Sequence, residues 1–272
     1  MSREFSFGRN WDRYIRESYT EERVETSRRK LLEFLGPPGI EGRSFLDLGC
    51  GSGIHSLAAY RAGASSVVSV DVDLFSVRAT RTVREAAGSP ENWEVLQGSV
   101  LDPEFVSRLA PADIVYSWGV LHHTGNLWEA VRNASSRILP GGRFYLAIYD
   151  KTAMSAYWTE VKRRYNAASP FRKRLMEWAY VYRTFLRTKS PSYLLKNYRY
   201  IRDYRTLRGM AFWTDVRDWL GGWPYEPATA EEVVGFCETT LGLTTVAVKA
   251  GEANIEYLFS RDTKAGKEST SR

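Results

Sequence analysis

Residues 45–53 read FLDLGCGSG, an apolar run that leads into three glycines at alternate positions. A helical pattern begins at Ile54, directly after Gly49, Gly51 and Gly53, so the stretch predicts a strand, a tight glycine loop and a helix. Glycine tolerates positive φ and lets a ligand approach the main chain, and the first amides of a helix are unpaired. The loop is therefore suited to hold a polar small molecule.

A carboxylate follows at the end of the next apolar run, where VVSV, residues 67–70, leads into Asp71. A second parallel strand would bring this carboxylate beside the glycine loop, where it can bind a ribose diol. Strand, loop, helix, strand and acid together predict a site for a nucleotide-type cofactor.

Two details separate the possible cofactors. A dinucleotide fingerprint needs G-x-G-x-x-G, but the position of its third glycine is Ile54. Asp47 directly precedes the glycines, which disfavours a pyrophosphate and suits a cationic ligand held directly or through water. An NAD oxidoreductase is therefore a disfavoured alternative.

Apolar runs and helical patterns alternate from residue 43 onward. We expect strands near 44–48, 67–71, 93–97, 112–117 and 142–148, and helices near 54–63, 74–87, 103–109 and 126–138. This alternation predicts an α/β fold with a doubly wound, mostly parallel sheet whose ligands bind at the carboxyl ends of the strands. The segments 243–249 and 255–260 fit an antiparallel pair that completes a seven-stranded sheet.

Five motifs in this order resemble those of class I S-adenosylmethionine-dependent methyltransferases. They are the acid-and-glycine loop, VVSVD (67–71), LQGSVLD (96–102), DIVYSWGVLHH (113–123) and LPGGRFYLAIY (139–149). The resemblance is close over residues 40–150 and weaker to residue 260, and it includes bacterial small-molecule enzymes with GVLHHTG-type motifs. It implies a Rossmann-like methyltransferase fold and S-adenosyl-L-methionine as cofactor.

The resemblance also implies which residues contact the cofactor. They lie in the glycine loop, at the strand ends and in an N-terminal lid, residues 1–42, as follows: Asp47, Gly49, Cys50, Gly51, Gly53, Asp71, Val72, Ser99, Val100, Ser117, Trp118, Trp11 and Tyr14. For Trp11 and Tyr14, an ordinary aromatic contact with the sheet edge is an equal alternative.

The chain contains three histidines, and His122 and His123 stand together after the fourth expected strand, where an acceptor should meet the methyl group. A histidine there could act as a general base, with His123 preferred over His122, or serve only as structure. His55, at the start of the first helix, fits a packing or capping role.

Composition limits the remaining possibilities. Two cysteines and three histidines provide neither a disulfide framework nor zinc-type spacing, so we expect no metal. The charged N-terminus lacks a signal sequence and no apolar run is long enough to span a bilayer, so a cytoplasmic protein without integral membrane association is expected.

Residues 151–222, which we call the insertion, interrupt the alternation. They contain 16 Lys and Arg against 5 Asp and Glu, and 15 of the 37 aromatic residues. A link of this length must carry its own structure, so we expect a mostly helical cap over the substrate side. Residues 223–260 then complete the sheet, after the core of 43–150, and 261–272 are expected to be disordered.

Candidate acceptor-binding residues lie at and after the end of the insertion. Asp215 and Asp218, one helical turn apart, could grip an amine or hydroxyl, although pairing with neighbouring arginines is the simpler explanation. Trp219, Trp223 and Tyr225 could form an apolar wall or simply cap core.

The basic, aromatic insertion allows three interpretations: nucleic acid binding, contact with an anionic membrane, or a solvated helical surface, the last favoured. We therefore expect methyl transfer to an oxygen or nitrogen of a small-molecule acceptor. A tRNA-modifying methyltransferase, to which the WGVLHH turn bears a faint resemblance, and a non-catalytic cofactor-binding module are the alternatives. The oligomeric state is not predicted.

Overall fold

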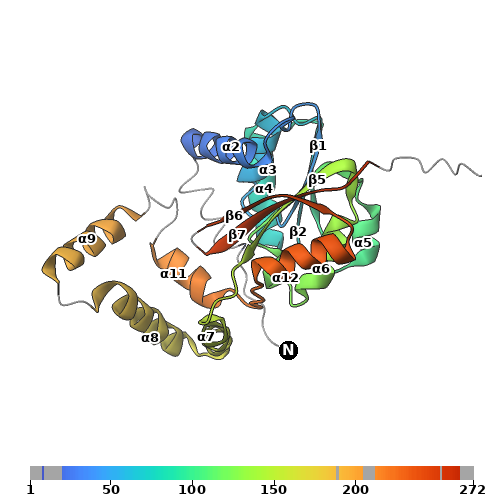
Figure 1. Cartoon of the computed structure of the whole chain (residues 1–272). Coiled ribbons are helices and arrows are strands. Elements are labelled where there is room, and N and C mark those ends of the chain that lie inside the picture. Colours follow the sequence, from blue (N-terminus) through green and yellow to red (C-terminus); the bar gives the residue numbers. More distant parts are fainter. Residues whose placement is uncertain (1–7, 9–19, 188–189, 205–211, 252, 264–272) are drawn as a thin grey trace, which may run out of the picture.

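The computed structural model describes residues 8, 20–187, 190–204, 212–251 and 253–263. Figure 1 shows a central sheet with helices on both faces and a group of helices that projects from one side of it. The expected lid residues Trp11 and Tyr14, and residues 264–272 of the expected disordered tail, lie outside the described residues.

Seven strands form one sheet in the order β3-β2-β1-β4-β5-β7-β6. The first five pair in parallel, whereas β7 is antiparallel to both β5 and β6. The strands are β1 Ser44–Leu48, β2 Ser66–Asp71, β3 Trp93–Gln97, β4 Ala112–Trp118, β5 Ile138–Tyr149, β6 Thr244–Ala250 and β7 Asn254–Ser260. The predicted α/β, doubly wound fold is confirmed.

Strand order reverses beside β1, which pairs with β2 on one side and with β4 on the other. Asp47 of β1 faces Ser69 across one pairing and Tyr116 across the other. Ligands of open parallel sheets bind beyond the carboxyl ends of the strands at such a reversal. The quoted glycine loop therefore begins at the position that the topology favours for a ligand.

Helices cover both faces of the sheet because successive side chains of each strand point to opposite sides. Phe45 packs in one apolar cluster, with α2 Glu21–Leu35, α3 Ile54–Arg61 and α4 Leu74–Ala86. Leu46 and Leu48 pack in the other, with α6 Leu127–Ser135 and α12 Ala230–Gly235. The short helix α5 Pro103–Arg108 precedes β4, and the π-helical turn Phe236–Thr240 follows α12.

Side-chain caps fix where several of these helices begin. The Asp73 carboxylate accepts a hydrogen bond from the Phe75 amide (2.8 Å) at the start of α4. Thr229 and Glu232 form a reciprocal capping box at the start of α12. Local side-chain hydrogen bonds therefore fix the start of α4, which the sequence predicted at residue 74, and the start of α12.

β5 begins earlier than the predicted residue 142. Ala112 pairs with Ile138, whereas Ile114 pairs with Arg143, so β5 bulges between these two pairs. A Cβ at Gly142 would lie 2.8 Å from the Leu139 carbonyl oxygen, too close for a side chain. The glycines thus allow a bulge inside the strand where the sequence suggested a turn before it.

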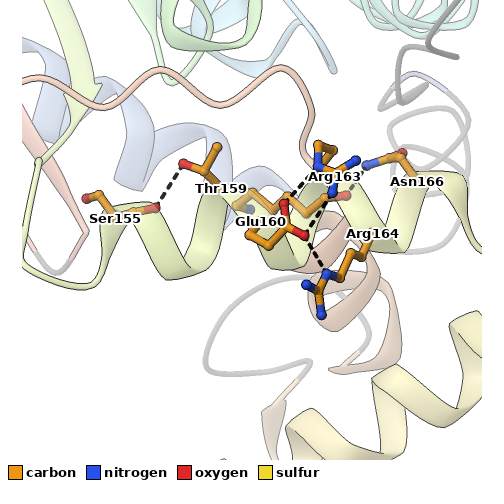
Figure 2. A network of polar contacts seen from close by, with 7 residues as sticks. Ser155, Thr159, Glu160, Arg163, Arg164 and Asn166 are labelled. Atoms are coloured by element: carbon orange, nitrogen blue, oxygen red, sulfur yellow. Dashed lines mark hydrogen bonds and ion pairs between the residues drawn. The ribbon is translucent and has the colours of Figure 1, made fainter.

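The insertion is mostly helical in its described part and has a small apolar core of its own (Figure 1). Its elements are α7 Ser155–Ala167, α8 Pro170–Val181, the π-helical turn η2 Tyr182–Leu186, α9 Pro191–Arg202 and α11 Phe212–Gly221. Figure 2 shows polar contacts along α7, where Glu160 accepts hydrogen bonds from Arg163 (2.8 Å) and Arg164 (2.5 Å). These exposed ion pairs contribute little to stability.

Candidate functional site

The glycine loop connects β1 to α3 and packs tightly against its neighbours. Gly49 and Gly53 adopt φ of 88° and 77°, a region that favours glycine. A Cβ at Gly49 would lie 2.4 Å from the Val120 side chain, and a Cβ at Gly53 would lie 2.9 Å from Cα of Thr80. The loop is therefore held between the turn after β4 and helix α4, with no room for side chains at these two glycines.

Asp71 lies at the carboxyl end of β2 and contacts the loop directly, as the spacing predicted. Its Oδ2 accepts a hydrogen bond from the Gly51 amide (3.0 Å), and its Oδ1 accepts one from the Asp73 amide (2.9 Å). Burial raises the pKa of Asp71 above its ordinary value. Val72, the next residue, is 62% exposed at the same edge.

Asp47 is buried at the end of β1, where a chain of hydroxyl groups supports it. The Trp93 indole donates to Ser69 Oγ (2.8 Å), Ser69 donates to Ser56 Oγ (2.7 Å), and Ser56 donates to Asp47 Oδ2 (2.6 Å). Burial, with a smaller contribution from the charge of Asp71, raises the pKa of Asp47 to about 7. A positively charged ligand would relieve both effects, so the two acids fit a cationic cofactor.

Ser99 and Val100, expected on the adenine side, lie in the turn after β3. Ser99 Oγ accepts a hydrogen bond from the Leu101 amide (3.1 Å), and the Val100 carbonyl accepts one from Asn133 (2.9 Å). These contacts fix the turn and use the hydroxyl of Ser99 within it.

Three other residues expected at the cofactor site have partners inside the protein. Ser117 is fully buried and donates to the Leu48 carbonyl (2.7 Å), which joins β4 to β1. The Trp118 indole, 39% exposed, donates to Glu256 of β7 (3.1 Å). Buried Cys50 accepts a hydrogen bond at its Sγ from a Thr80 hydroxyl (3.2 Å). The hydroxyl of Ser117 and the indole of Trp118 therefore bond within the sheet.

The histidine pair lies in a single 3₁₀ turn, Leu121–His123, directly after β4. His123 Nδ1 lies 2.6 Å from the Pro224 carbonyl, which can only accept, so this nitrogen carries the proton. His122 Nδ1 accepts from the Tyr149 amide (3.4 Å), so its proton is on Nε2, which is buried and has no hydrogen-bond partner among the described residues. The two rings therefore carry their protons on different nitrogens.

Burial controls the ionisation of all three histidines. It lowers the pKa of His123 to about 3 and that of His122 well below its ordinary value. It also lowers the pKa of His55 to about 4, where that ring packs 5.3 Å from the ring of Tyr116. All three are neutral at physiological pH, and the position of His55 fits the expected packing role.

A buried lysine of the insertion lies close enough to His122 to affect its charge, and the sequence did not predict its position. Lys162 of α7 is 1% exposed, and its Nζ lies 4.3 Å from the ring centre of Trp219 and 4.9 Å from that of Tyr225. The ammonium also donates to the Trp219 carbonyl. Trp158, Lys162 and Tyr165 share one face of α7, and this helical spacing is the signal that could have placed Lys162 inside.

Tyr149, at the end of β5, connects the histidines to this lysine site. Its ring centre lies 4.2 Å from that of His122, 5.9 Å from that of Trp219 and 5.5 Å from that of Tyr225. The junction of core and insertion is thus an aromatic cluster with buried polar groups inside it.

The other candidate acceptor residues separate into two places. Asp215 accepts a hydrogen bond from the Tyr204 hydroxyl within the insertion. Asp218 lies close enough to Lys162 to favour its charged form. Trp223 is partly buried and precedes Pro224, the partner of His123. Asp218, Trp219, Trp223 and Tyr225 therefore gather at the junction, whereas Asp215 does not.

Lys162 makes the stability of the protein depend on pH. Burial lowers its pKa from 10.5 to about 7, so between these values the unfolded chain holds more protons than the folded one. The contribution of this residue to the free energy of unfolding should rise with pH from 7 to 10.5 and stay at its minimum below 7. Urea unfolding at several pH values should show that Lys162→Met reduces this slope.

Lys196→Met, which removes an exposed lysine of α9, is the matched control and should leave the slope unchanged. Equal slopes in the wild-type chain and in Lys162→Met would contradict this assignment.

Among the described residues, no group of three or more His, Cys, Asp or Glu side chains is arranged to hold a metal ion. The helices in the same part of the chain include none that is both long and apolar enough to cross a membrane.

Comparisons with known proteins agree with this geometry. The methyltransferase domain family matches residues 19–199. The tRNA U34 carboxymethyltransferase of Methylococcus capsulatus is 34% identical over 107 residues, 39% of this chain and 32% of that protein. The ubiquinone biosynthesis O-methyltransferase of a Methylobacterium species is 29% identical over 125 residues, 44% of this chain and 47% of that protein.

The chain therefore matches about a third to a half of the length of these relatives. Among solved structures, PKMT2 of Rickettsia typhi in complex with AdoHcy has a TM-score of 0.57 at 15% identity, over 90% of this chain and 53% of that one. The family match, which covers most of the chain, and the acid-and-glycine site place it in one family. The chain belongs to the methyltransferase domain family, and its sheet has the Rossmann-like fold of class I S-adenosylmethionine-dependent methyltransferases.

Proposed function

We propose that this chain transfers the methyl group of S-adenosylmethionine to an oxygen or nitrogen of a small-molecule acceptor. The observation that carries the proposal is the aromatic junction beyond β4, where Tyr149 packs against both histidine rings and against Trp219 and Tyr225. A site lined by buried and half-buried aromatic rings suits a compact, partly apolar acceptor better than a nucleic acid strand.

The proposed reaction is an in-line displacement. The cofactor supplies a methyl group on a sulfonium; its carbon–sulfur bond breaks as the bond to the acceptor forms, and the acceptor proton leaves. We assign cofactor binding to the glycine loop with Asp47 and Asp71, by the fit of two acids to one cationic ligand. The protein contributes mainly by alignment and by excluding water, with His123 Nε2 as the acceptor of the proton or of a hydrogen bond.

Methylation of tRNA is the second candidate. It is supported by the relatives named as tRNA U34 carboxymethyltransferases and by the basic insertion. Those relatives match only 39% to 47% of this chain, so their substrate is weak support.

An assay with methyl-labelled cofactor separates the two candidates. The chain is incubated with a panel of phenols, quinols and amines, and in parallel with total tRNA, and the label is counted in the organic extract and in acid-precipitated RNA. We expect label in a small acceptor. Label that enters RNA alone would replace the proposal by the tRNA function.

The histidine assignment predicts a particular pH profile. Because the pKa of His123 is about 3, this ring is neutral from pH 5 to pH 8 and should add no inflection near 6.5 to kcat. His123→Gln should lower kcat by about 10- to 100-fold with little change in KM for the cofactor. An inflection near 6.5 that disappears in His123→Gln would contradict the assignment.

A further inference from the structure

An exposed apolar stripe runs along α8 and η2, on the side opposite their buried face. Its members are Phe171, Leu175, Trp178, Tyr182 and Leu186, which are 73%, 54%, 57%, 57% and 40% exposed. Their spacing of three or four residues places them on one face of a helix. We call these five residues the α8 stripe.

The other face of this helix supplies the packing of the insertion. Val181 is 3% exposed within the insertion core, and buried Glu177 accepts a hydrogen bond from the Tyr165 hydroxyl (2.7 Å). The helix therefore has a buried face that explains its position in the fold. The α8 stripe is additional to it, apart from Trp178, whose ring centre lies 4.8 Å from that of Trp213 of α11.

This exposure is concentrated in the insertion. Of the sixteen large hydrophobic side chains that are exposed in the described part of the chain, eleven belong to the insertion. Leu194, Leu195 and Tyr198 of α9 are among them, at 37%, 51% and 63% exposure. Contiguous apolar surface of this kind is typical of an interaction site.

Positive charges flank the α8 stripe. Arg174 lies on one side of it along the helix, and Arg172 and Arg183 lie on the other, all three exposed. The insertion as a whole has 16 basic and 5 acidic residues. A partner with negative charge beside an apolar region would complement this arrangement.

RNA and an anionic lipid bilayer both fit such charges, and the residue types of the α8 stripe distinguish between them. RNA would use the arginines for phosphates and the aromatic rings for stacking, but Leu175 and Leu186 would gain nothing from bases. At a bilayer surface, Phe and Leu enter the acyl boundary, Trp and Tyr lie at the headgroup level, and Arg binds lipid phosphates. Every residue of the α8 stripe is of a type that contacts a bilayer surface in this way.

We propose that the α8 stripe and its flanking arginines dock the insertion on the surface of an anionic lipid bilayer. The contact is peripheral, with the helix lying in the interface. This inference goes beyond the proposed function and does not depend on which acceptor is methylated. It gives the basic, aromatic character of the insertion a partner that the methyl-transfer site does not require.

Sedimentation of the full chain with lipid vesicles tests the proposal. We expect binding to vesicles of phosphatidylcholine mixed with phosphatidylglycerol, weaker binding to phosphatidylcholine alone, and weaker binding as salt rises above about 0.1 M. The variant Phe171→Ser with Leu175→Ser should lower the partition coefficient by about tenfold or more, because it removes two apolar anchors.

The matched control is Val246→Ser with Val248→Ser, which changes two side chains of β6 that are 46% and 44% exposed. It should leave vesicle binding unchanged. Circular dichroism and S-adenosylhomocysteine affinity should be the same in both variants and in the wild-type chain, which separates lost docking from lost folding.

Several results would overturn the proposal. They are equal binding to neutral and anionic vesicles, equal loss in the stripe variant and the β6 variant, or no vesicle binding at all. A dimer that forms without lipid in sedimentation velocity, and that the stripe variant abolishes, would also overturn the proposal. The α8 stripe would then bind a second copy of the chain. Binding of total tRNA that falls with the stripe variant, without vesicle binding, would assign the surface to RNA instead.

Discussion

Asp71→Ala is expected to lower the affinity for S-adenosylhomocysteine by about 100-fold, since a hydrogen bond to a charged group contributes about 1.5–3 kcal/mol. The proposed ribose contact would be lost. So would the hydrogen bonds from Gly51 and Asp73 that hold the loop against β2. Isothermal titration calorimetry on the purified variant measures the effect directly.

Two further variants separate these contributions. Asp71→Asn keeps one acceptor oxygen for a backbone amide but loses the charge, so it should lie between the wild-type chain and Asp71→Ala. Asp203→Ala removes an acid of the insertion that pairs with Arg202, and it should bind as the wild-type chain does. Unchanged affinity in Asp71→Ala would show that the ribose site has been wrongly assigned.

Gly53→Ala is expected to lower the free energy of unfolding by about 2–5 kcal/mol, the sum of a left-handed backbone penalty and of overpacking. Gly53 has φ of 77°, and the new Cβ would lie 2.9 Å from Cα of Thr80, a backbone atom that cannot rotate away. Urea denaturation gives the loss as a shift of the midpoint.

Gly88→Ala is the matched control because Gly88 has φ of 91° but no atom within 4 Å of the added Cβ. Its free energy of unfolding should fall only by the cost of the left-handed backbone, about 1–2 kcal/mol. If the two variants lost the same stability, the tight packing of the glycine loop on α4 would not be a determinant of the fold.

The sheet could be predicted because its signals are local. Strands β1 and β3 fall at the predicted residues, since short apolar runs bounded by turn residues mark both ends. The start of β5 could not be predicted, because a bulge that pairs Ile138 with Ala112 depends on contacts with another strand. Pairing across strands is tertiary information that a single run of residues does not contain.

The position of the candidate cofactor site at the carboxyl ends of the strands was predicted, but the hydrogen bonds within it were not. The proximity of Asp71 to the glycine loop follows from parallel strands that end at one edge. The sequence did not reveal that the Ser117 hydroxyl bonds to β1 or that Ser56 and Ser69 support Asp47. Such hydrogen bonds join residues far apart in the chain, and a serine in a sequence does not indicate which group its hydroxyl will bond to.

The junction with the insertion was the least predictable part. Lysine is rarely buried, so the sequence suggests that Lys162 is one of the exposed charges of a basic segment, although it is buried. Its burial depends on the rings of Trp219 and Tyr225, which belong to residues more than fifty positions later. The same holds for the contact of His123 with the Pro224 carbonyl.

Calorimetric titration of the purified chain with S-adenosylhomocysteine, with NADH and a short tRNA as parallel ligands, shows which cofactor the glycine loop binds. We expect one site of about micromolar affinity for S-adenosylhomocysteine, with a free energy of binding of about −8 kcal/mol, and no binding of NADH. No binding of S-adenosylhomocysteine, together with binding of NADH, would contradict the assignment of the glycine loop, Asp47 and Asp71 to a sulfonium cofactor.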